Sequence, residues 1–328
     1  MEREKNWRIG DLYKGIPLQS LTCIVILVVF IAIVSIVNRS FLDGSNIQSL
    51  LTQIAPMGII SIGAAFVIIT GGIDFSTGTG LAMAAVFGGV MYQAANNNLF
   101  VMVLSCILLG AVLGAVNGAV ITILHLQPFI VTLATMSLAQ GAALFIAEGR
   151  VVFLNDPAIT RIGSGNIFGF FPTSFFIFIV VCIIAWILLN RTKMGIYIYA
   201  IGGNEEAARF SGIQVERYKF FAFLFAGVCT GLGALITICR IEQVAPNISG
   251  TTQLDAIAAA VMGGVSLSGG KGNISGIVLG VFIIGVISTS LTFMKIPVTA
   301  QDAIKGMIIL GVLLIDSFFN RHVKRIVK

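Results

Sequence analysis

The sequence predicts an all-α membrane protein with about ten transmembrane helices, and its composition carries this prediction. Hydrophobic residues make up 57% of the 328 residues and charged residues only 10%, whereas about 25% of the residues in an ordinary soluble domain are charged. The mean hydropathy is +1.01. Because a helix needs roughly 20 apolar residues to cross a bilayer, most of the chain is expected to lie in lipid. Short or broken helices are expected at its glycine-rich turns.

Apolar runs divide the chain into ten expected spans. In chain order these are 18–37, 50–70, 78–95, 99–124, 128–147, 168–190, 219–238, 248–265, 273–292 and 302–319. The third and eighth are short and adjoin glycine-rich segments, so nine or eleven spans also fit the pattern. The first follows basic residues, as a signal peptide does, but no cleavage site follows it, which favours an uncleaved helix. We therefore expect an N-terminal tail over 1–17, one membrane domain over 18–319 and a C-terminal tail over 320–328.

Lysine and arginine residues are distributed unevenly over the expected loops. With a cytoplasmic N-terminus and ten spans, 14 of the 20 basic residues lie on the cytoplasmic side, as the positive-inside rule requires. Both termini and the loop 191–219 are then cytoplasmic. The net charge of +6 thus reflects topology. It does not indicate nucleic-acid binding, because the basic residues are spread over separate loops.

The loop 191–219 contains a compact helix signature, which reads AIGGNEEAARFSGI over residues 200–213. Asn204 is a favourable N-cap, the acidic residues after it suit a helix N-terminus, and Gly212 is a natural stop. The enclosed helix is only about 10 Å long and too short to be stable alone. We therefore expect it to dock onto a soluble partner and receive force from it. The residues assigned to this surface are Gly202, Gly203, Asn204, Glu205, Glu206, Ala207, Ala208, Ser211, Gly212 and Ile213.

Two glycine-rich segments, 71–80 and 263–272, share the pattern G-G-[IV]-x-[FL]-S-x-G-x-G at a constant offset of 192 residues. Corresponding glycine-interrupted segments in two halves of a chain indicate a transport pathway, although glycine-rich turns can also converge by composition. With ten spans both turns are cytoplasmic, which favours a parallel repeat. A miscounted span between them would make the repeat inverted.

Glycines also recur at four-residue spacing, which lets helix backbones approach closely in a membrane. Such a stripe either allows two helices to pack closely or provides a surface along which one helix can slide against another. The glycines concerned are Gly110, Gly114 and Gly118 on one helix, Gly272, Gly276 and Gly280 on another, and Gly227 with Gly231 on a third.

The sequence shows no recognisable catalytic, cofactor or metal site. It contains no HExxH, no Cys/His metal spacing and no G-x-S-x-G elbow. The Gly-Gly-Lys at 269–271 lacks both the first glycine and the Ser or Thr of a phosphate loop. The five cysteines are expected to pack in the spans rather than form disulfides. No enzyme activity is therefore predicted.

Few ionisable residues lie inside the expected spans, and each is a candidate for the path of a solute. Asp74 and Asp255 either face such a path or gate, or cap broken helices at their N-termini. No buried Lys–Asp pair of the kind an ion-driven pump needs is expected. Gln53, Asn117 and Thr132 are neutral candidates that suit an uncharged, hydroxylated solute, or else bond helices to one another.

Several segments taken together resemble the permeases of monosaccharide ABC importers, and ribose permeases above all. The segments are 69–76, 128–133, 197–204, 211–213, 254–259 and 263–264, in the order found in that family. The resemblance extends from about residue 40 to about residue 316. The loop pattern G-x-N-x-x-A-A-x-x-S-G-I matches at every position, from Gly202 to Ile213.

The resemblance implies the fold of the large ten-span importer permeases of the cobalamin type. It also implies a membrane subunit that performs no chemistry and works by alternating access in the bacterial cytoplasmic (inner) membrane. Its implied partners are a cytoplasmic ABC ATPase subunit docked on the loop, an extracytoplasmic sugar-binding protein and a second permease chain. The last would form a homodimer or a heterodimer.

Other readings stay open at this stage. The chain has Gln140 where relatives often carry Arg, and Gln253 where they often carry an acidic residue. Ribose, xylose, galactose, allose and a furanosyl signalling molecule therefore all remain candidates. A self-sufficient secondary carrier or facilitator would also use repeats and broken helices, but it would transport alone and respond to an ion gradient. An intramembrane enzyme is disfavoured by the missing catalytic constellation.

Overall fold

The computed structural model of the chain describes residues 18–37, 39–154, 156–167, 169–297, 300–307 and 310–311. The described helices are α1 (Leu18–Val37), η2 (Arg39–Leu42), α2 (Gly44–Ile69), α3 (Thr77–Ala94), α4 (Leu99–Ile123), α5 (Pro128–Ile146), α6 (Pro157–Gly163), α7 (Thr173–Arg191), α8 (Lys193–Gly203), α9 (Glu205–Phe210), α10 (Val215–Ile241), α11 (Thr252–Met262) and α12 (Ile274–Phe293). Residues 300–307 are also helical. Both expected tails and most of the tenth expected span lie outside the described residues.

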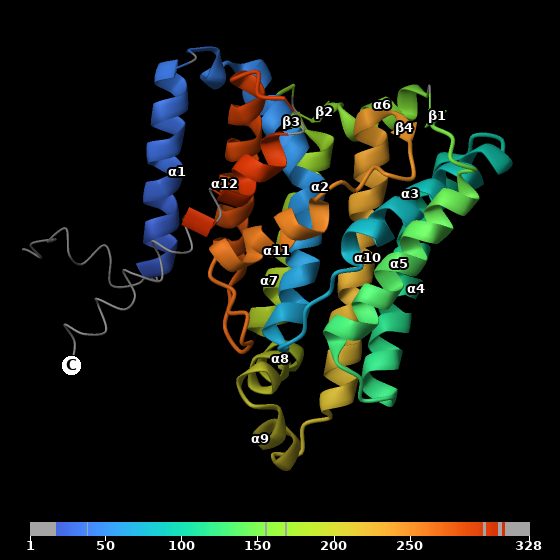
Figure 1. The fold of residues 1–328 in the computed structure, drawn as a ribbon, viewed down its shortest axis with the longest axis vertical. Helices are drawn as coiled ribbons and strands as arrows, with labels where there is room; N and C mark the ends of the chain where they lie inside the picture. The colour runs from blue at the N-terminus through green and yellow to red at the C-terminus, as the bar shows by residue number, and fades with distance from the viewer. Residues whose placement is uncertain are drawn as a thin grey trace, which may run out of the picture.

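Four short strands form two small antiparallel pairs. β1 (Val152–Phe153) pairs with β4 (Gln243–Val244), so that Val152 lies opposite Val244. β2 (Asn166–Ile167) pairs with β3 (Phe171–Pro172) as a hairpin. Figure 1 shows α6 and these strands at one end of the molecule and α8 and α9 at the other.

The prediction of an all-α membrane protein is confirmed. Among the described residues, six helices are long and apolar enough to cross a membrane: α2, α4, α5, α7, α10 and α12. Two shorter apolar helices cover Leu27–Ile36 and Thr252–Met262. The helix α3 has 18 residues but is not among the six. By length and composition, six of the ten expected spans are therefore supported as membrane-crossing helices among the described residues.

Three sequence boundaries were wrong. The expected span 248–265 is the 11-residue helix α11, because Pro, Asn, Ser and Gly within 246–250 favour turns and those residues form turns here. The expected span 168–190 begins only at Thr173, since the β2–β3 hairpin precedes it. The loop 191–219 is largely helical, because it holds α8, α9 and the start of α10.

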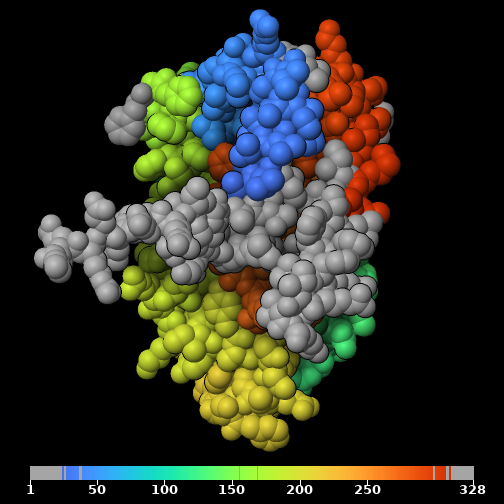
Figure 2. Space-filling view, turned by 90° about the vertical axis from the view of Figure 1, so that its left-hand side faces the viewer, coloured from blue at the N-terminus to red at the C-terminus, as the bar shows by residue number. Residues whose placement is uncertain are grey.

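The helices divide into an inner and an outer group. The protein itself buries 83% of the most apolar stretch of α2 and 72% of those of α10 and α12, against 22% for α4 and 28% for α5 and α7. The inner helices thus form the core, and the outer ones leave large apolar side chains for lipid. Figure 2 shows α1, in blue, on the outside of the molecule, with the yellow residues that follow α8 at the lower end.

Glycines bring α4 and α10 into backbone contact. A methyl group added at Gly114 would lie 2.9 Å from the Cα of Gly227, and one added at Gly110 would lie 2.6 Å from the nitrogen of Gly231. These two stripes therefore serve as close helix packing. The third stripe was placed wrongly in part: Gly272 precedes α12, whose N-cap is Asn273.

Candidate functional site

The helix α9 has the caps that the sequence predicts. The side-chain Oδ1 of Asn204 accepts a hydrogen bond from the backbone N–H of Ala207 at 2.9 Å, which satisfies one of the free donors of the first turn. At the other end Gly212 has φ +81°. Its N–H donates to the carbonyl of Arg209 at 3.0 Å, and that of Ile213 donates to Ala208 at 3.1 Å. This pair of bonds is a Schellman motif.

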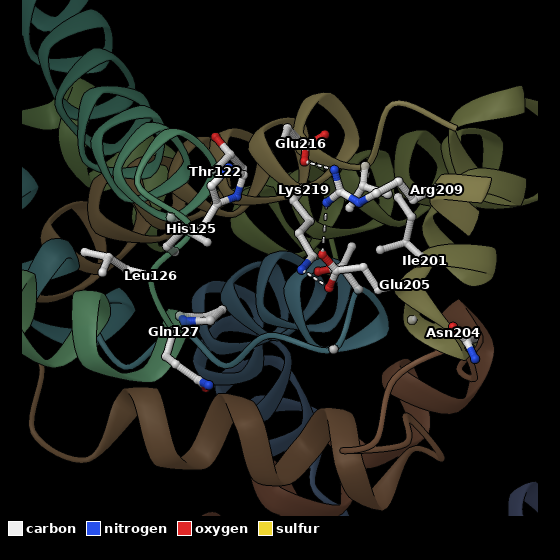
Figure 3. A pocket seen from close by; sticks show the side chains of 17 residues that line it. Thr122, His125, Leu126, Gln127, Ile201, Asn204, Glu205, Arg209, Glu216 and Lys219 are labelled. Atoms are coloured by element: carbon white, nitrogen blue, oxygen red, sulfur yellow. Dashed lines mark hydrogen bonds and ion pairs between the residues drawn. The ribbon is translucent and has the colours of Figure 1, made fainter. Parts of the chain in front are cut away.

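Glu205 of the predicted set and three charged residues outside it fasten α9 to the start of α10. Arg209 forms ion pairs with Glu216 at 2.5 Å and with Glu205 at 3.6 Å, and Lys219 pairs with Glu205 at 2.5 Å. Figure 3 shows Arg209 between the two glutamates. Only the four-residue spacing of Glu205 and Arg209 signals this network in the sequence. Ala208 is buried beneath it in a small apolar cluster with α8 and α10.

The opposite face of α9 is exposed in the part of the chain that the structure describes. Glu206, Ala207 and Ser211 are exposed. Phe210, which the sequence analysis did not select, leaves 89% of its surface exposed. An exposed large aromatic side chain at the end of a short helix is a typical anchor for a protein partner. The helix is therefore fixed to the membrane domain on one face and presents an apolar residue on another.

A cavity of ≈ 470 Å³ lies between α9, the end of α2, the α4–α5 turn and the start of α10 (Figure 3). Its charged walls are the ion-pair network, so two acidic and two basic side chains balance there. His125 also lines it, from a backbone with φ +51°. The cavity is thus polar, and its four charged side chains carry no net charge.

Beside this cavity the end of α8 contacts the last residue of α2 and the second glycine-rich turn. A methyl group on Gly202 would overlap the carbonyl of Ile69 and the nitrogen of Gly270. The N–H of Gly270 itself donates to the Ile69 carbonyl at 2.9 Å. Nearby, the hydroxyl of Tyr199 donates to the carbonyl of Gly272 at 2.8 Å. We call this contact of Gly202, Ile69 and Gly270 the glycine junction.

The two glycine-rich turns share a backbone conformation. After α2, the N–H of Gly71 bonds to Ile68 at 2.9 Å, and after α11 that of Gly264 bonds to Val261 at 2.9 Å. Gly71 and Gly264 have φ +85° and +96°. The structural offset is therefore 193 residues and not 192, because the left-handed glycine is the second of its pair in the later turn. Both turns lie at the α8 end (Figure 1), which favours the parallel repeat.

Three of the predicted pathway residues gather where α3 begins. Asp74 is buried, and its Oδ1 accepts hydrogen bonds from the backbone N–H of Ser76 at 2.8 Å and from the Ser76 hydroxyl at 2.6 Å. The amide of Asn117 donates to the same hydroxyl at 2.8 Å. Thr132 donates to the carbonyl of Ile73 at 3.2 Å. Ser76 is the N-cap of α3 and no side-chain hydrogen bond caps that helix, so Asp74 fixes the turn before α3 and does not bond to the first-turn N–H groups of the helix.

Asp255 is in a different environment, and here the sequence analysis was wrong. Its Oδ2 lies 2.9 Å from the Nζ of Lys305, and the two side chains are only 17% and 11% exposed. Lys305 also pairs with Asp302 at 2.9 Å. A buried Lys–Asp pair therefore exists. Residue 305 falls near the start of the expected span 302–319, and no local pattern places it beside a residue 50 positions earlier.

Gln53 and Asp255 line one cavity of ≈ 230 Å³. Gln53 accepts a hydrogen bond from Thr289 of α12 at 3.3 Å. The structure thus divides the five pathway candidates into two groups, with Asp74, Asn117 and Thr132 at the start of α3. Within the described residues, no three His, Cys, Asp or Glu side chains form a group that could hold a metal ion.

Sequence comparison matches residues 46–313 to a family described as branched-chain amino acid transport system / permease component. The ribose import permease protein RbsC of Haemophilus influenzae is 36% identical over 298 residues, which cover 90% of this chain and 92% of that protein. RbsC of Bacillus subtilis is 39% identical over 298 residues, 88% and 90% of the two chains. The galactose/methyl galactoside import permease protein MglC of Salmonella typhimurium is 35% identical over 311 residues, 89% and 92%. No solved structure matches the chain significantly.

Proposed function

Because the chain belongs to the family described as branched-chain amino acid transport system / permease component, we propose that it is the transmembrane permease subunit of an ATP-binding cassette importer. Its cargo is a monosaccharide, ribose or a related sugar, since the full-length relatives are named for ribose and galactose. ATP is hydrolysed on a separate subunit, and the chain itself is not an enzyme. The observation that carries the proposal is this similarity over about 90% of the chain.

The exposed face of α9 is the docking surface for the ATPase. The predicted loop residues from Gly202 to Ile213 shape and cap this helix, and Phe210 supplies its exposed apolar side chain. The ion pairs to Glu205 and Glu216 fix α9 to α10, so that a push on α9 moves a membrane helix with it. Closure of the ATPase dimer in this way drives alternating access.

The rest of the assembly follows from the family resemblance. An extracytoplasmic sugar-binding protein delivers the sugar, and a second permease chain, identical or not, completes the pathway. The chain has about ten spans, a fold of the cobalamin-importer type and cytoplasmic tails at 1–17 and 320–328 in the bacterial inner membrane. At the start of α3, Asp74, Asn117 and Thr132 form a hydrogen-bonded cluster that holds the first glycine-rich turn in place.

The decisive experiment is sugar-dependent ATP hydrolysis by the complex purified from native membranes and reconstituted in liposomes. Asn204→Ala removes the N-cap, which costs about 1 kcal/mol, and Phe210→Ala removes the exposed anchor. Both are expected to abolish most sugar-stimulated hydrolysis. Phe153→Ala is the matched control, because Phe153 is a similarly exposed aromatic residue at the opposite end. Unchanged stimulation in both α9 variants would rule out this coupling surface.

One observation favours a second function, that of a secondary carrier. The buried Lys305–Asp255 pair is a kind of group that ion-driven carriers use. A carrier predicts uptake by the purified chain alone, driven by an ion gradient and indifferent to ATP. An importer subunit predicts no uptake without its ATPase. Liposomes that contain only this chain, tested with radiolabelled ribose and imposed proton or sodium gradients, separate the two.

A further inference from the structure

A polar cavity of ≈ 230 Å³ lies inside the helix bundle, between α2, α10, α11, α12 and the helical residues 300–307. We propose that this cavity, which we call the Arg240 cavity, is a binding site for a neutral polyhydroxylated solute and that Arg240 is its recognition residue. The proposal rests on the proposed sugar transport and names the place where the sugar is held. Its polar lining residues are Gln53, Thr237, Arg240, Thr252, Asp255, Ser288, Gln301, Asp302 and Lys305.

Among these residues, Arg240 gives the strongest indication of a ligand. It lies in the last turn of α10, although the sequence analysis placed it in a loop beyond that helix. Its Nε is buried and has no hydrogen-bond partner, and no carboxylate within the described residues pairs with its guanidinium. An unsatisfied donor on a buried charged group costs more than 1–3 kcal/mol, the order for a neutral group. Oxygen atoms of a solute or of water in the cavity would accept hydrogen bonds from the N–H groups of the guanidinium.

The charged groups that line the cavity sum to zero. Arg240 and Lys305 supply two positive charges, and Asp255 and Asp302 supply two negative ones. Lys305 already pairs with both carboxylates, so the charged groups are fixed before a solute enters. A balanced set of this kind gives no net attraction for an anion or a cation. It presents hydrogen-bond donors and acceptors to a neutral molecule.

The neutral lining residues narrow the class of solute. Gln53, Thr237 and Ser288 offer amide and hydroxyl groups, and the described residues that line the cavity include no aromatic one. Its ≈ 230 Å³ is several times the ~30 Å³ that one water occupies in the liquid. A small molecule with several hydroxyl groups fits this combination of size and chemistry, whereas the branched apolar side chain of an amino acid such as leucine would leave the amide and hydroxyl groups that it faces unpaired.

A second polar cavity indicates how a solute reaches the site. It has a volume of ≈ 350 Å³, lies between the start of α2 and the end of α12, and shares Gln53 with the Arg240 cavity. The hydrogen bond from Thr289 to Gln53 crosses the gap between these helices. Both helix ends lie at the end of the molecule opposite α9 (Figure 1). Through Gln53 the Arg240 cavity therefore adjoins a cavity at the end opposite the proposed ATPase.

Site-directed labelling tests the site directly. Ser288→Cys places a thiol on the cavity wall, and Ser290→Cys is the matched control, because Ser290 lies two residues along the same helix and is 1% exposed. The purified full-length chain in liposomes is treated with a maleimide, and labelling at residue 288 or 290 is read by mass spectrometry, so the native cysteines stay. We expect labelling at 288 and not at 290. D-ribose at ten times its dissociation constant should slow it about tenfold.

A titration extends the test over ribose, galactose and leucine up to molar concentration. Protection by a sugar and not by leucine supports the site. Labelling at 288 that no sugar slows, or no labelling at 288, overturns it. Neither result touches the importer proposal, which is judged separately by ATP-driven uptake.

Arg240 is tested by uptake in the reconstituted complex. Arg240→Gln removes the charge, and Arg240→Lys keeps it but loses the planar fork. If Arg240 recognises the sugar, both variants lose the protection by sugar of residue 288 against labelling. In Arg240→Gln the half-saturating sugar concentration of ATP-driven uptake should also rise about tenfold or more, which corresponds to a loss of about 1.4 kcal/mol in binding free energy. Full protection in both variants would exclude Arg240 as the recognition residue, even if uptake is reduced.

Discussion

Lys305 holds two carboxylates at the Arg240 cavity. Its Nζ lies 2.9 Å from Asp255 and 2.9 Å from Asp302, and Asp302 is 54% exposed while Asp255 is only 17% exposed. The attraction to the exposed partner is weakened by solvent, whereas the attraction to the buried partner is not. The pair with Asp255 is therefore the contact on which the position of residues 300–307 depends.

We predict unequal costs for removing the two members of this pair. Lys305→Met leaves Asp255 buried without a cation, which typically destabilises a protein by about 3–5 kcal/mol. Asp255→Asn should cost clearly less, because Lys305 keeps Asp302. Adding Asp255→Asn to Lys305→Met should recover much of the loss. Thermal unfolding of the purified chain in detergent measures all three variants.

The order of the effects is the critical result. Equal destabilisation by the two single variants, with no recovery in the double variant, would show that the carboxylate and the ammonium act independently. Asp43→Asn is a suitable control, because Asp43 is an exposed carboxylate with no ion pair in the described part of the chain.

Residue-level features could be predicted only where they are local in sequence. The caps at Asn204 and Gly212 were correct because a helix end depends on residues within one turn of it. The roles of Lys305 and Arg240 were missed, since each depends on a helix end or a partner far along the chain. Asp74 could be named as a candidate, but only coordinates show that it fixes the turn before α3.

At the scale of elements, α8 connects the proposed ATPase surface with both glycine-rich turns. It continues through Asn204 into α9, and its last turn contacts Ile69, which ends α2 just before the first turn, and Gly270 of the second turn. Because these contacts are backbone to backbone, no flexible side chain can absorb a displacement of α8. A movement of α9 should therefore reach both turns through the glycine junction.

We predict that Gly202→Ala uncouples the transporter without releasing its ATPase. The added methyl group overlaps the Ile69 carbonyl and must push α8 away from both turns. Overpacking of this kind costs typically 1–3 kcal/mol, and uptake should fall about tenfold or more, since about 1.4 kcal/mol in a barrier is tenfold in rate. Co-purification with the ATPase should stay intact. Uptake and ATP hydrolysis in liposomes measure the effect.

A glycine outside both the glycine junction and the proposed ATPase surface provides the control. A methyl group on Gly141 of α5 meets nothing within 4 Å, and its φ is not positive, so Gly141→Ala should transport normally. Tyr199→Phe removes only the hydrogen bond to Gly272 and should show an intermediate loss. Normal coupling in Gly202→Ala would mean that α8 does not carry the movement.

Element boundaries could be predicted where apolar runs are uninterrupted. The helices α4, α5 and α12 match their expected spans closely, because a long apolar run has one stable form in lipid. The expected span 248–265 was too long, since its apolar average hides a turn over 246–250. The repeat was found one residue out of register, because glycine pairs are alike in sequence while only one glycine of each pair takes the positive φ.

For the whole molecule, the two functional regions lie at opposite ends. The α9 surface and the glycine junction occupy one end, and α6, the strand pairs and the start of α2 occupy the other (Figure 1). The Arg240 cavity shares Gln53 with the cavity at the second end. Composition could predict a membrane protein, but no local pattern could place two cavities on one side of a contact between segments that lie far apart in the sequence.

This arrangement predicts a definite sidedness in the membrane. Ser164 follows α6 and Gln214 precedes α10, and both are exposed. If basic loops face the cytoplasm, a membrane-impermeant maleimide should label Ser164→Cys in intact cells and Gln214→Cys only after permeabilisation. Labelling at Ser288→Cys should then follow the outer pattern of Ser164→Cys, since the Arg240 cavity shares Gln53 with the cavity at that end. Between residues 164 and 214 the described chain has one helix able to cross the membrane, α7, so the two residues should lie on opposite faces. Labelling of both from the same face would overturn the proposed orientation of α9 toward a cytoplasmic ATPase.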